Sequence, residues 1–228
     1  AGGDPLYVED VFSTYLYDGT NTTLGINNGI DLAGEGGMVW CKSRTATASY
    51  AHNVFNTESG IGKFVQTQAT TAELTAPAGY SLTSFNSDGF SLGTNYNNEN
   101  RYFINSQTTN VSWTFRKAEK FFDIQTWSGN DSANRQLSHN LGSVPGMMIV
   151  KKTTGAYAWQ IYHVSNGNTK FMEFGSFRVQ TSSAVWNNTT PTDSVFTVGN
   201  EYGVNQSGSD YVAYLFASEA GGYGDDGT

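Results

Sequence analysis

Cleavage of a glycosidic bond requires two carboxyl groups about 5–10 Å apart that face each other in a cleft. The chain offers several candidates, namely Asp31, Glu35, Glu58, Glu73, Asp88, Glu99, Asp123, Asp193 and Glu201. Most of them lie in turns rich in Gly and Asn, where an acidic side chain usually accepts hydrogen bonds from the backbone. No motif identifies any of them as catalytic, so we expect no enzymatic activity. Convergence of Asp88 with another carboxylate would instead favour a polysaccharide depolymerase.

The sequence gives little support for a metal site or a phosphate-binding loop. The histidines His52, His139 and His163 show neither HxH nor HExxH spacing, and no P-loop motif occurs. The stretches "NYNNEN" (95–100) and "YGDDG" (223–227) supply oxygen ligands but do not match a calcium loop. We therefore predict no metal and no cofactor.

Sugar binding is the chemistry that the composition permits most readily. It needs exposed aromatic faces beside polar donors and acceptors, and the chain is rich in both. The aromatic candidates near predicted loops are Tyr50, Tyr96, Tyr102, Trp127, Trp159, Tyr162 and Trp186. Trp159 and Trp186 also occur in strand-like contexts, so a place in the core is the alternative for both.

Composition and charge narrow the class of protein and its partners. Charged residues make up 14% of the 228 residues, aromatic residues another 14%, and Gly, Asn, Thr and Ser are abundant, which is typical of a β-rich protein with many turns. The formal net charge of −8 repels phosphate backbones and anionic lipids, so we expect no nucleic-acid partner. No apolar run approaches the roughly 20 residues that span a bilayer, so we expect no membrane insertion.

The sequence repeats itself in two halves. "GGMVWCK" (36–42) returns as "PGMMIVKK" (145–152), and other phrases pair in the same order. These pairs are "YLYDG" with "QTWSG", "DGFSLG" with "SVFTVG", and "VSWTFRK" with "VAYLFAS", and Tyr50 is paired with Trp159 by its distance from the preceding lysine. Cys41 aligns with Val150, which indicates a small buried hydrophobic residue and not a reactive thiol.

Alternating aromatic and β-branched residues, with turn signals every 8–12 residues, predict an all-β fold. We predict two tandem antiparallel β-sandwich units related by the repeat. The predicted boundaries are 1–11 for an N-terminal linker, 12–118 and 119–220 for the units, and 221–228 for a Gly- and Asp-rich linker, and the chain is expected to be a processed product or a piece of a longer protein. "TTAELTA" (70–76) is the best helix candidate.

The repeated strand is apolar on both faces, whereas a strand of a two-layer sandwich normally has one polar face. A loop, the sister unit or another subunit must therefore cover the outer face. Lys42 and Lys151 are expected to mark the points where the strands return to water.

Long phrases of the chain resemble repeats in virion proteins of tailed bacteriophages, especially marine ones. These phrases are "DPLYVEDVFSTYLYDG", "NGIDLAGEGGMVWCKSR", "LTSFNSDGFSLG", "SWTFRKAEKFFDI", "HNLGSVPGMMIVKK", "WNNTTPTDSVFTVG" and "YVAYLFASEAGGYGDDG". The resemblance implies a tail-fibre, appendage or decoration protein of the virion, with a jelly-roll or concanavalin-like sandwich. It implies other virion proteins as partners, a homo-oligomer with a trimer as one option, and a host-surface glycan as candidate ligand. The alternative is a carbohydrate-binding module. No catalytic residues are implied.

Overall fold

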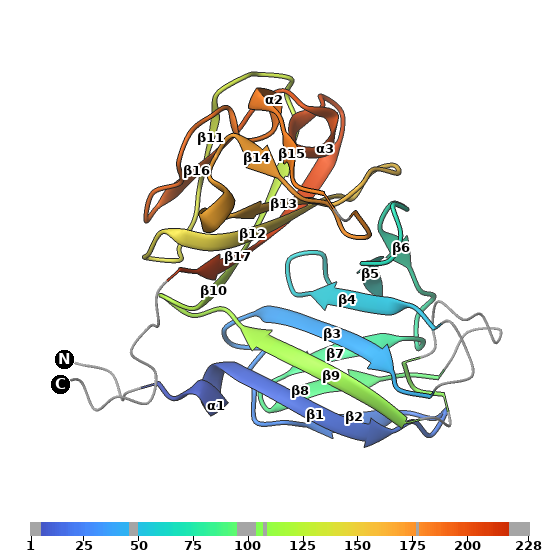
Figure 1. Ribbon diagram of the computed structural model, residues 1–228. Coiled ribbons are helices and arrows are strands. Elements are labelled where there is room, and N and C mark those ends of the chain that lie inside the picture. Colours follow the sequence, from blue (N-terminus) through green and yellow to red (C-terminus); the bar gives the residue numbers. More distant parts are fainter. Residues whose placement is uncertain (1–5, 46–49, 95–103, 107–108, 177, 219–228) are drawn as a thin grey trace. The chain divides into compact units, whose positions relative to one another are not determined.

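The computed structural model describes residues 6–45, 50–94, 104–106, 109–176 and 178–218 (Figure 1). The protein is nearly all β, with 45% of residues in strands and 8% in helices, and its strand pairs are antiparallel throughout the named sheets. The chain forms two compact units. Unit 1 contains the described residues of Ala1–Thr67 and Leu74–Lys117, and unit 2 contains those of Gln68–Glu73 and Ala118–Gly221.

Unit 1 consists of a six-stranded and a three-stranded sheet (Figure 1). In sheet order, the six strands are β1 (Phe12–Asp18), β9 (Thr109–Arg116), β3 (Gly37–Ser43), β4 (His52–Asn56), β5 (Lys63–Gln66) and β6 (Leu74–Thr75). The three strands are β2 (Leu24–Asn27), β8 (Gly89–Leu92) and β7 (Leu82–Asn86), and helix α1 (Val8–Val11) precedes β1. Side chains from both sheets, such as Val39, Cys41 and Phe90, share one buried core.

Unit 2 is built around a four-stranded sheet with two small sheets. The four strands are β10 (Phe122–Ser128), β17 (Asp210–Ala217), β12 (Pro145–Lys152) and β13 (Gln160–His163). The small sheets pair β11 (Arg135–Ser138) with β16 (Val195–Val198), and β14 (Lys170–Phe171) with β15 (Gln180–Thr181). The helices are η2 (Val164–Asn166), α2 (Ser183–Trp186) and α3 (Tyr202–Asn205). Met148, Val150 and Phe196 contribute to a second buried core.

The strand registers of the two units correspond residue by residue. Trp40 lies opposite Trp113 in unit 1, and Ile149 lies opposite Tyr214 in unit 2. The same correspondence relates Tyr17–Asn110 to Trp127–Tyr211, Ile26–Phe90 to Leu137–Phe196, and Cys41–Asn53 to Val150–Gln160. The last pair corrects one alignment predicted from the sequence. Asn53 corresponds to Gln160, so the residue that corresponds to Trp159 is His52 and not Tyr50.

The inner face of each repeated strand fills its core, as Val39 and Cys41 do in β3 and Met148 and Val150 do in β12. The outer face of β12 is covered in part by the segment Gln68–Glu73. The backbone carbonyl of Thr70 accepts hydrogen bonds from Tyr157 N (2.8 Å) and from Lys151 Nζ (3.4 Å). A loop therefore covers the outer face of β12 near Lys151. A loop, the sister unit and another subunit were the three coverings that the sequence allowed.

The structure overturns the expectations for Lys151 and for the stretch 70–76. Lys151 does not return to water, because its side chain is fully buried and its Nζ donates to the carbonyls of Thr70 and Lys152. Lys42 is half-buried, and its Nζ donates to the carbonyl of Tyr50 at 2.5 Å. The stretch 70–76 is not a helix, because its first residues extend along unit 2 and Leu74–Thr75 forms strand β6.

Candidate functional site

Two hydrogen-bonded groups of side chains in unit 2 lie against Gly203, and we call them together the Glu173–Glu201 cluster. Its members are Tyr157, Gln160, Glu173, Gln180 and Glu201. Gln160 begins β13, Gln180 begins β15, and Glu173 lies just after β14. Tyr157 lies in the connection between β12 and β13, and Glu201 is the N-cap residue of α3. Four separate stretches of unit 2 therefore meet at this cluster.

Glu173 is held by two glutamine amides. Gln160 Nε2 donates to Glu173 Oε1 at 3.1 Å, and Gln180 Nε2 donates to Glu173 Oε2 at 3.0 Å. Each carboxylate oxygen thus accepts one hydrogen bond from an amide, which fixes the plane of the carboxylate. A carboxylate oxygen can accept a second hydrogen bond, so both retain a free acceptor direction.

Glu201 is oriented by a backbone amide and a phenol. Its Oε2 accepts from Gly203 N and caps α3, and its Oε1 accepts from the hydroxyl of Tyr157. Burial raises the pKa of Tyr157 above its usual value, and the charges of Glu201 and then Glu173 raise it further. Tyr157 therefore stays protonated as a donor, and it lies within electrostatic reach of both carboxylates.

Gly203 allows these groups to pack closely. A Cβ atom on Gly203 would lie 2.7 Å from Cε1 of Tyr157 and 2.8 Å from Cγ of Gln160. No side chain fits there without displacing a cluster member, so the glycine is a steric requirement of the site.

Gln160 carries a buried polar atom without a hydrogen-bond partner. Its side chain is 1% exposed, and its Oε1 has no hydrogen-bond partner. A buried carbonyl without a donor costs roughly 1–3 kcal/mol, and such atoms occur where a ligand or water completes the site. The amide cannot simply be reversed, because its nitrogen is needed to donate to Glu173.

Aromatic rings accompany the two acids along the chain. Phe174 follows Glu173, is 36% exposed, and contacts the buried ring of Trp159 edge-on with the centroids 5.4 Å apart. Tyr202 follows Glu201 and is 59% exposed. Each of the two acids is therefore followed in the sequence by a partly exposed aromatic residue. Neither of these aromatic residues is among the glycan-binding candidates predicted from the sequence.

Most of the predicted glycan-binding aromatics are packed inside the units. Trp127, Trp159 and Trp186 are almost fully buried, and their indole nitrogens donate to the backbone carbonyls of Val204, Ala69 and Lys170. Tyr162 is also buried, Tyr50 is half-buried, and Tyr96 and Tyr102 lie outside the described residues.

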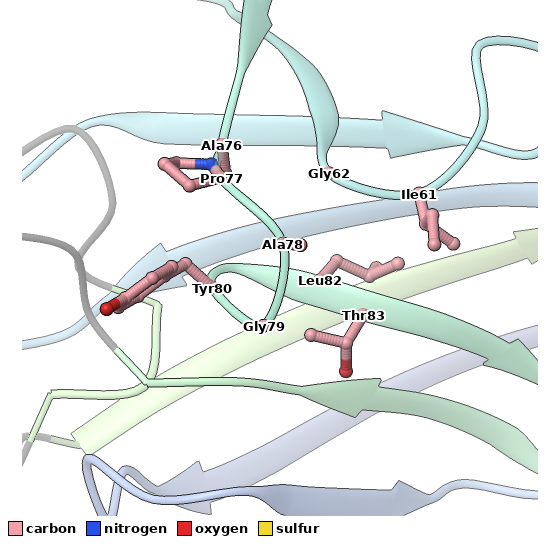
Figure 2. Close-up of a pocket in the computed structure, with 9 residues that line it drawn as sticks. All are labelled: Ile61, Gly62, Ala76, Pro77, Ala78, Gly79, Tyr80, Leu82 and Thr83. Atoms are coloured by element: carbon pink, nitrogen blue, oxygen red, sulfur yellow. The ribbon is translucent and has the colours of Figure 1, made fainter.

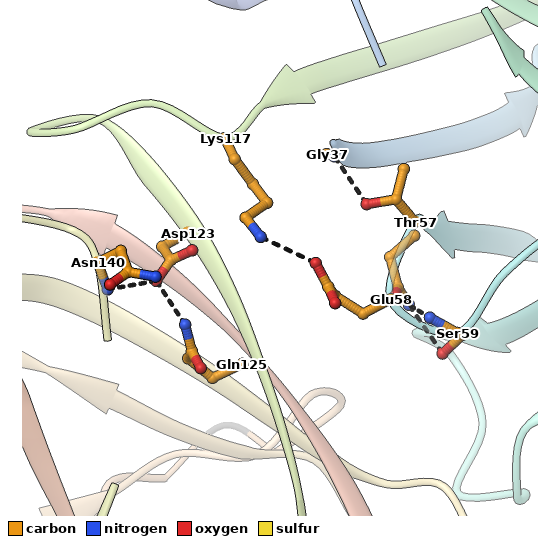
Figure 3. A network of polar contacts seen from close by, with 9 residues as sticks. Gly37, Thr57, Glu58, Ser59, Lys117, Asp123, Gln125 and Asn140 are labelled. Carbon is orange, nitrogen blue, oxygen red and sulfur yellow. Dashed lines mark hydrogen bonds and ion pairs between the residues drawn. The ribbon is translucent and has the colours of Figure 1, made fainter. Parts of the chain in front are cut away.

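Of the acids considered from the sequence, Glu201 is in the cluster, and its partner Glu173 was overlooked. Others are structural. Asp123 accepts from Gln125 Nε2 and Asn140 N, both at 2.8 Å, while Glu58 forms an ion pair with Lys117 at 2.8 Å (Figure 3). Asp88 is exposed in the turn between β7 and β8. The stretches 95–100 and 223–227 lie outside the described residues.

The histidine rings are engaged in local hydrogen bonds. His139 uses both nitrogens, accepting from Leu141 N and contacting the carbonyl of Thr192, and burial lowers its pKa. His52 accepts from Trp40 Nε1 at 3.1 Å, and burial lowers its pKa as well. No group of three metal-ligating side chains occurs among the residues described. These contacts hold the rings of His52 and His139 in place.

Unit 1 contains a pocket of about 260 Å³ between β5 and β7 (Figure 2). Its lining residues are Ile61, Gly62, Ala76, Pro77, Ala78, Gly79, Tyr80, Leu82 and Thr83. These side chains are mainly apolar and none is an acid or a base, so the pocket offers contact surface and no reactive group. The Glu173–Glu201 cluster is the stronger candidate for recognition of a polar ligand.

Comparison of the chain with known proteins identifies one family. The family described as domain of unknown function (DUF7483) matches residues 8–228. No curated protein and no solved structure matches the chain. In the described part of the chain, the helices are too short and too polar to cross a membrane.

Proposed function

This chain belongs to the DUF7483 family, and we propose that it is a non-enzymatic, sugar-binding component of a bacteriophage virion. The virion assignment is supported by the phrases that resemble tail-fibre and appendage proteins. A turn-rich, acidic and charge-poor β protein also suits a particle exposed to the medium.

We further propose that the two units are β-sandwiches produced by duplication of one ancestral unit. The matching registers of the paired strands support this origin, because a shift by one residue in either unit would exchange core and solvent faces. Concanavalin-like and jelly-roll sandwiches commonly serve as lectins and capsid domains, which agrees with the proposed role. That agreement is an analogy of fold, so the function depends on the site.

The observation that carries sugar binding is the Glu173–Glu201 cluster. Sugar hydroxyls are recognised by carboxylates and amides held in fixed orientations, with aromatic surface nearby. Glu173 is held by Gln160 and Gln180, and Glu201 by Tyr157 and a backbone amide. Fixed acceptors of this kind lose little conformational entropy when a ligand binds.

A glycan array with the purified chain tests the proposal. We expect binding to at least one glycan class and a loss of about tenfold or more in affinity when Glu173 is replaced by Gln. The Asp193→Asn variant is the control, because Asp193 is an exposed acid of the same unit that accepts a hydrogen bond from its neighbour Ser194. Equal binding by both variants would contradict the assignment of the site.

The depolymerase alternative is separated by its product. Incubation with each bound polysaccharide should release no new reducing ends, whereas a depolymerase would release them.

The virion assignment has its own test, since antibodies against this chain should label intact particles in electron micrographs. Labelling of host cells alone would contradict it.

A further inference from the structure

We propose that the Glu173–Glu201 cluster recognises a protonated amine, so that its glycan ligand carries an ammonium group, as in an oligomer of glucosamine. This inference rests on the proposed sugar-binding function and specifies its ligand. It follows from the hydrogen-bonding capacity that the cluster leaves unused, from its charge, and from the aromatic surface beside it.

Most of the donors in the cluster are already used. The hydroxyl of Tyr157 donates to Glu201, the amides of Gln160 and Gln180 donate to Glu173, and Gly203 N donates to Glu201. Apart from the second N–H of Gln180, the groups that remain are acceptors, namely the second acceptor positions of the carboxylate oxygens and the unpartnered Oε1 of Gln160.

An ammonium group matches such a set better than a hydroxyl does. It offers three donors and no acceptor, whereas a sugar hydroxyl has one donor and two acceptor lone pairs that this site leaves without partners. The buried Oε1 of Gln160, which has no hydrogen-bond partner, is a second and independent observation that points to a donating ligand. Gln160 lies within the cluster, because its amide contacts Glu173 and its Cγ lies against Gly203.

The charge balance points the same way. Neither Glu173 nor Glu201 forms an ion pair with a lysine, arginine or histidine in the described part of the chain. The charges of both carboxylates act on Tyr157, so a cation bound beside this ring would be attracted to both. The net charge of −8 also attracts a cationic ligand from a distance.

The aromatic rings near the cluster favour the same ligand. The ring of Tyr157 reaches Glu201, and the partly exposed Phe174 and Tyr202 lie next to the two acids in the sequence. The face of an aromatic ring attracts a cation, and the attraction is stronger where water is excluded. A neutral sugar gains contact with such a ring but not this electrostatic attraction.

Isothermal titration calorimetry with three probes tests the proposal: the glucosamine trisaccharide, its fully N-acetylated counterpart, and ethanolamine. The proteins are the wild type, Glu173→Gln, Glu201→Gln, and Asp193→Asn as the charge-matched control. Thermal unfolding of each variant verifies that it is folded. Glu201→Gln removes the cap of α3 and could prevent folding. In that case Glu173→Gln alone tests the proposal, because Glu173 does not cap a helix.

We expect the wild type and the control to bind the glucosamine trisaccharide. N-acetylation should weaken binding at least about tenfold, because it removes the positive charge of the ligand amine. Glu173→Gln or Glu201→Gln should weaken binding to a similar extent, because each removes a negative charge of the protein. Raising the salt concentration should weaken the remaining binding.

The outcomes separate the two proposals. Equal affinity for the acetylated trisaccharide would overturn amine recognition and leave sugar binding intact. Ethanolamine binding as tight as that of the trisaccharide would support amine recognition and overturn sugar binding. Failure of the folded wild type to bind any probe would overturn amine recognition, and the glycan array then decides sugar binding separately.

Discussion

Asn205 binds the turn that follows β10 in the same way as Asn105 binds the turn that follows β1. Asn105 Oδ1 accepts from Thr20 N at 2.9 Å, and Asn205 Oδ1 accepts from Asn130 N at 3.2 Å. Both side chains are fully buried. Each Nδ2 donates to a carbonyl two residues further on, that of Thr22 at 2.6 Å and that of Ser132 at 2.8 Å. The two units therefore share a buried polar contact as well as matching strand registers.

The first prediction concerns this pair. Replacing Asn205 or Asn105 by Ala should lower the free energy of unfolding by about 2–4 kcal/mol, because several backbone groups of a turn lose their partners at once. Urea denaturation measures the change. Asn200→Ala is the control, since Asn200 is exposed in unit 2, and its effect should stay within about 0.5 kcal/mol. Equal effects of the buried and exposed changes would contradict the prediction.

The second prediction concerns the buried hydroxyl of Tyr17, which donates to the carbonyl of Ile104 at 2.7 Å. Tyr17→Phe should destabilise the protein by about 1–2 kcal/mol, because the carbonyl loses this donor while the ring remains. Tyr15→Phe is the matched control on the same strand, because Tyr15 is 36% exposed. Its effect on the urea midpoint should be close to zero, and a midpoint shift equal to that of Tyr17→Phe would refute the assigned contact.

The third prediction concerns Cys41. Burial raises the pKa of its thiol to about 12, and the side chain is fully buried. A disulfide reagent at pH 8 should therefore leave the folded protein unmodified and should modify one thiol per chain once the protein is unfolded. Rapid modification under native conditions would contradict this burial.

The equivalent position of unit 2 supplies a companion experiment. Val150 occupies the register position of Cys41, so Cys41→Val should change the free energy of unfolding by less than about 1.5 kcal/mol. Cys41→Ser should cost more, because it buries a hydroxyl in an apolar core. The reverse order of stability would show that the two positions are not equivalent.

The fourth prediction concerns the pH dependence produced by Lys151. Burial, and secondly the charge of Lys152, lower the pKa of Lys151 from 10.5 to about 8. Between these two values the unfolded chain holds a proton that the folded chain has released, so this residue makes stability rise with pH in that window. Urea midpoints at pH 7.5 and 9.5 should show a contribution that Lys151→Met removes.

Lys170→Met provides the control for that experiment, because Lys170 is exposed in the same unit. It should retain the pH dependence of the wild type, measured as the difference between the two midpoints. An unchanged pH dependence in Lys151→Met would mean that Lys151 does not release its proton in this window.

The strands and the repeat could be predicted from the sequence because local patterns encode them. Alternating apolar residues define β9 and β17, and the paired phrases gave an alignment that the strand registers follow almost everywhere. The pairing of Tyr50 with Trp159 failed because the connection before β4 is longer than that before β13, and counting along a loop does not measure register. The burial of Cys41 was predictable from its apolar neighbours and its counterpart Val150.

The sequence by itself determined the β architecture, the paired phrases in matching order and the acidic, charge-poor composition, because residue type and local spacing fix these properties. The tertiary structure alone decided which polar groups meet. Glu173 and Glu201 approach Tyr157 from separate stretches, and Thr70 reaches Lys151 from a distant part of the chain. Contacts between residues far apart in sequence leave no periodic signal, since they arise only when the sheets fold and bring the connections together.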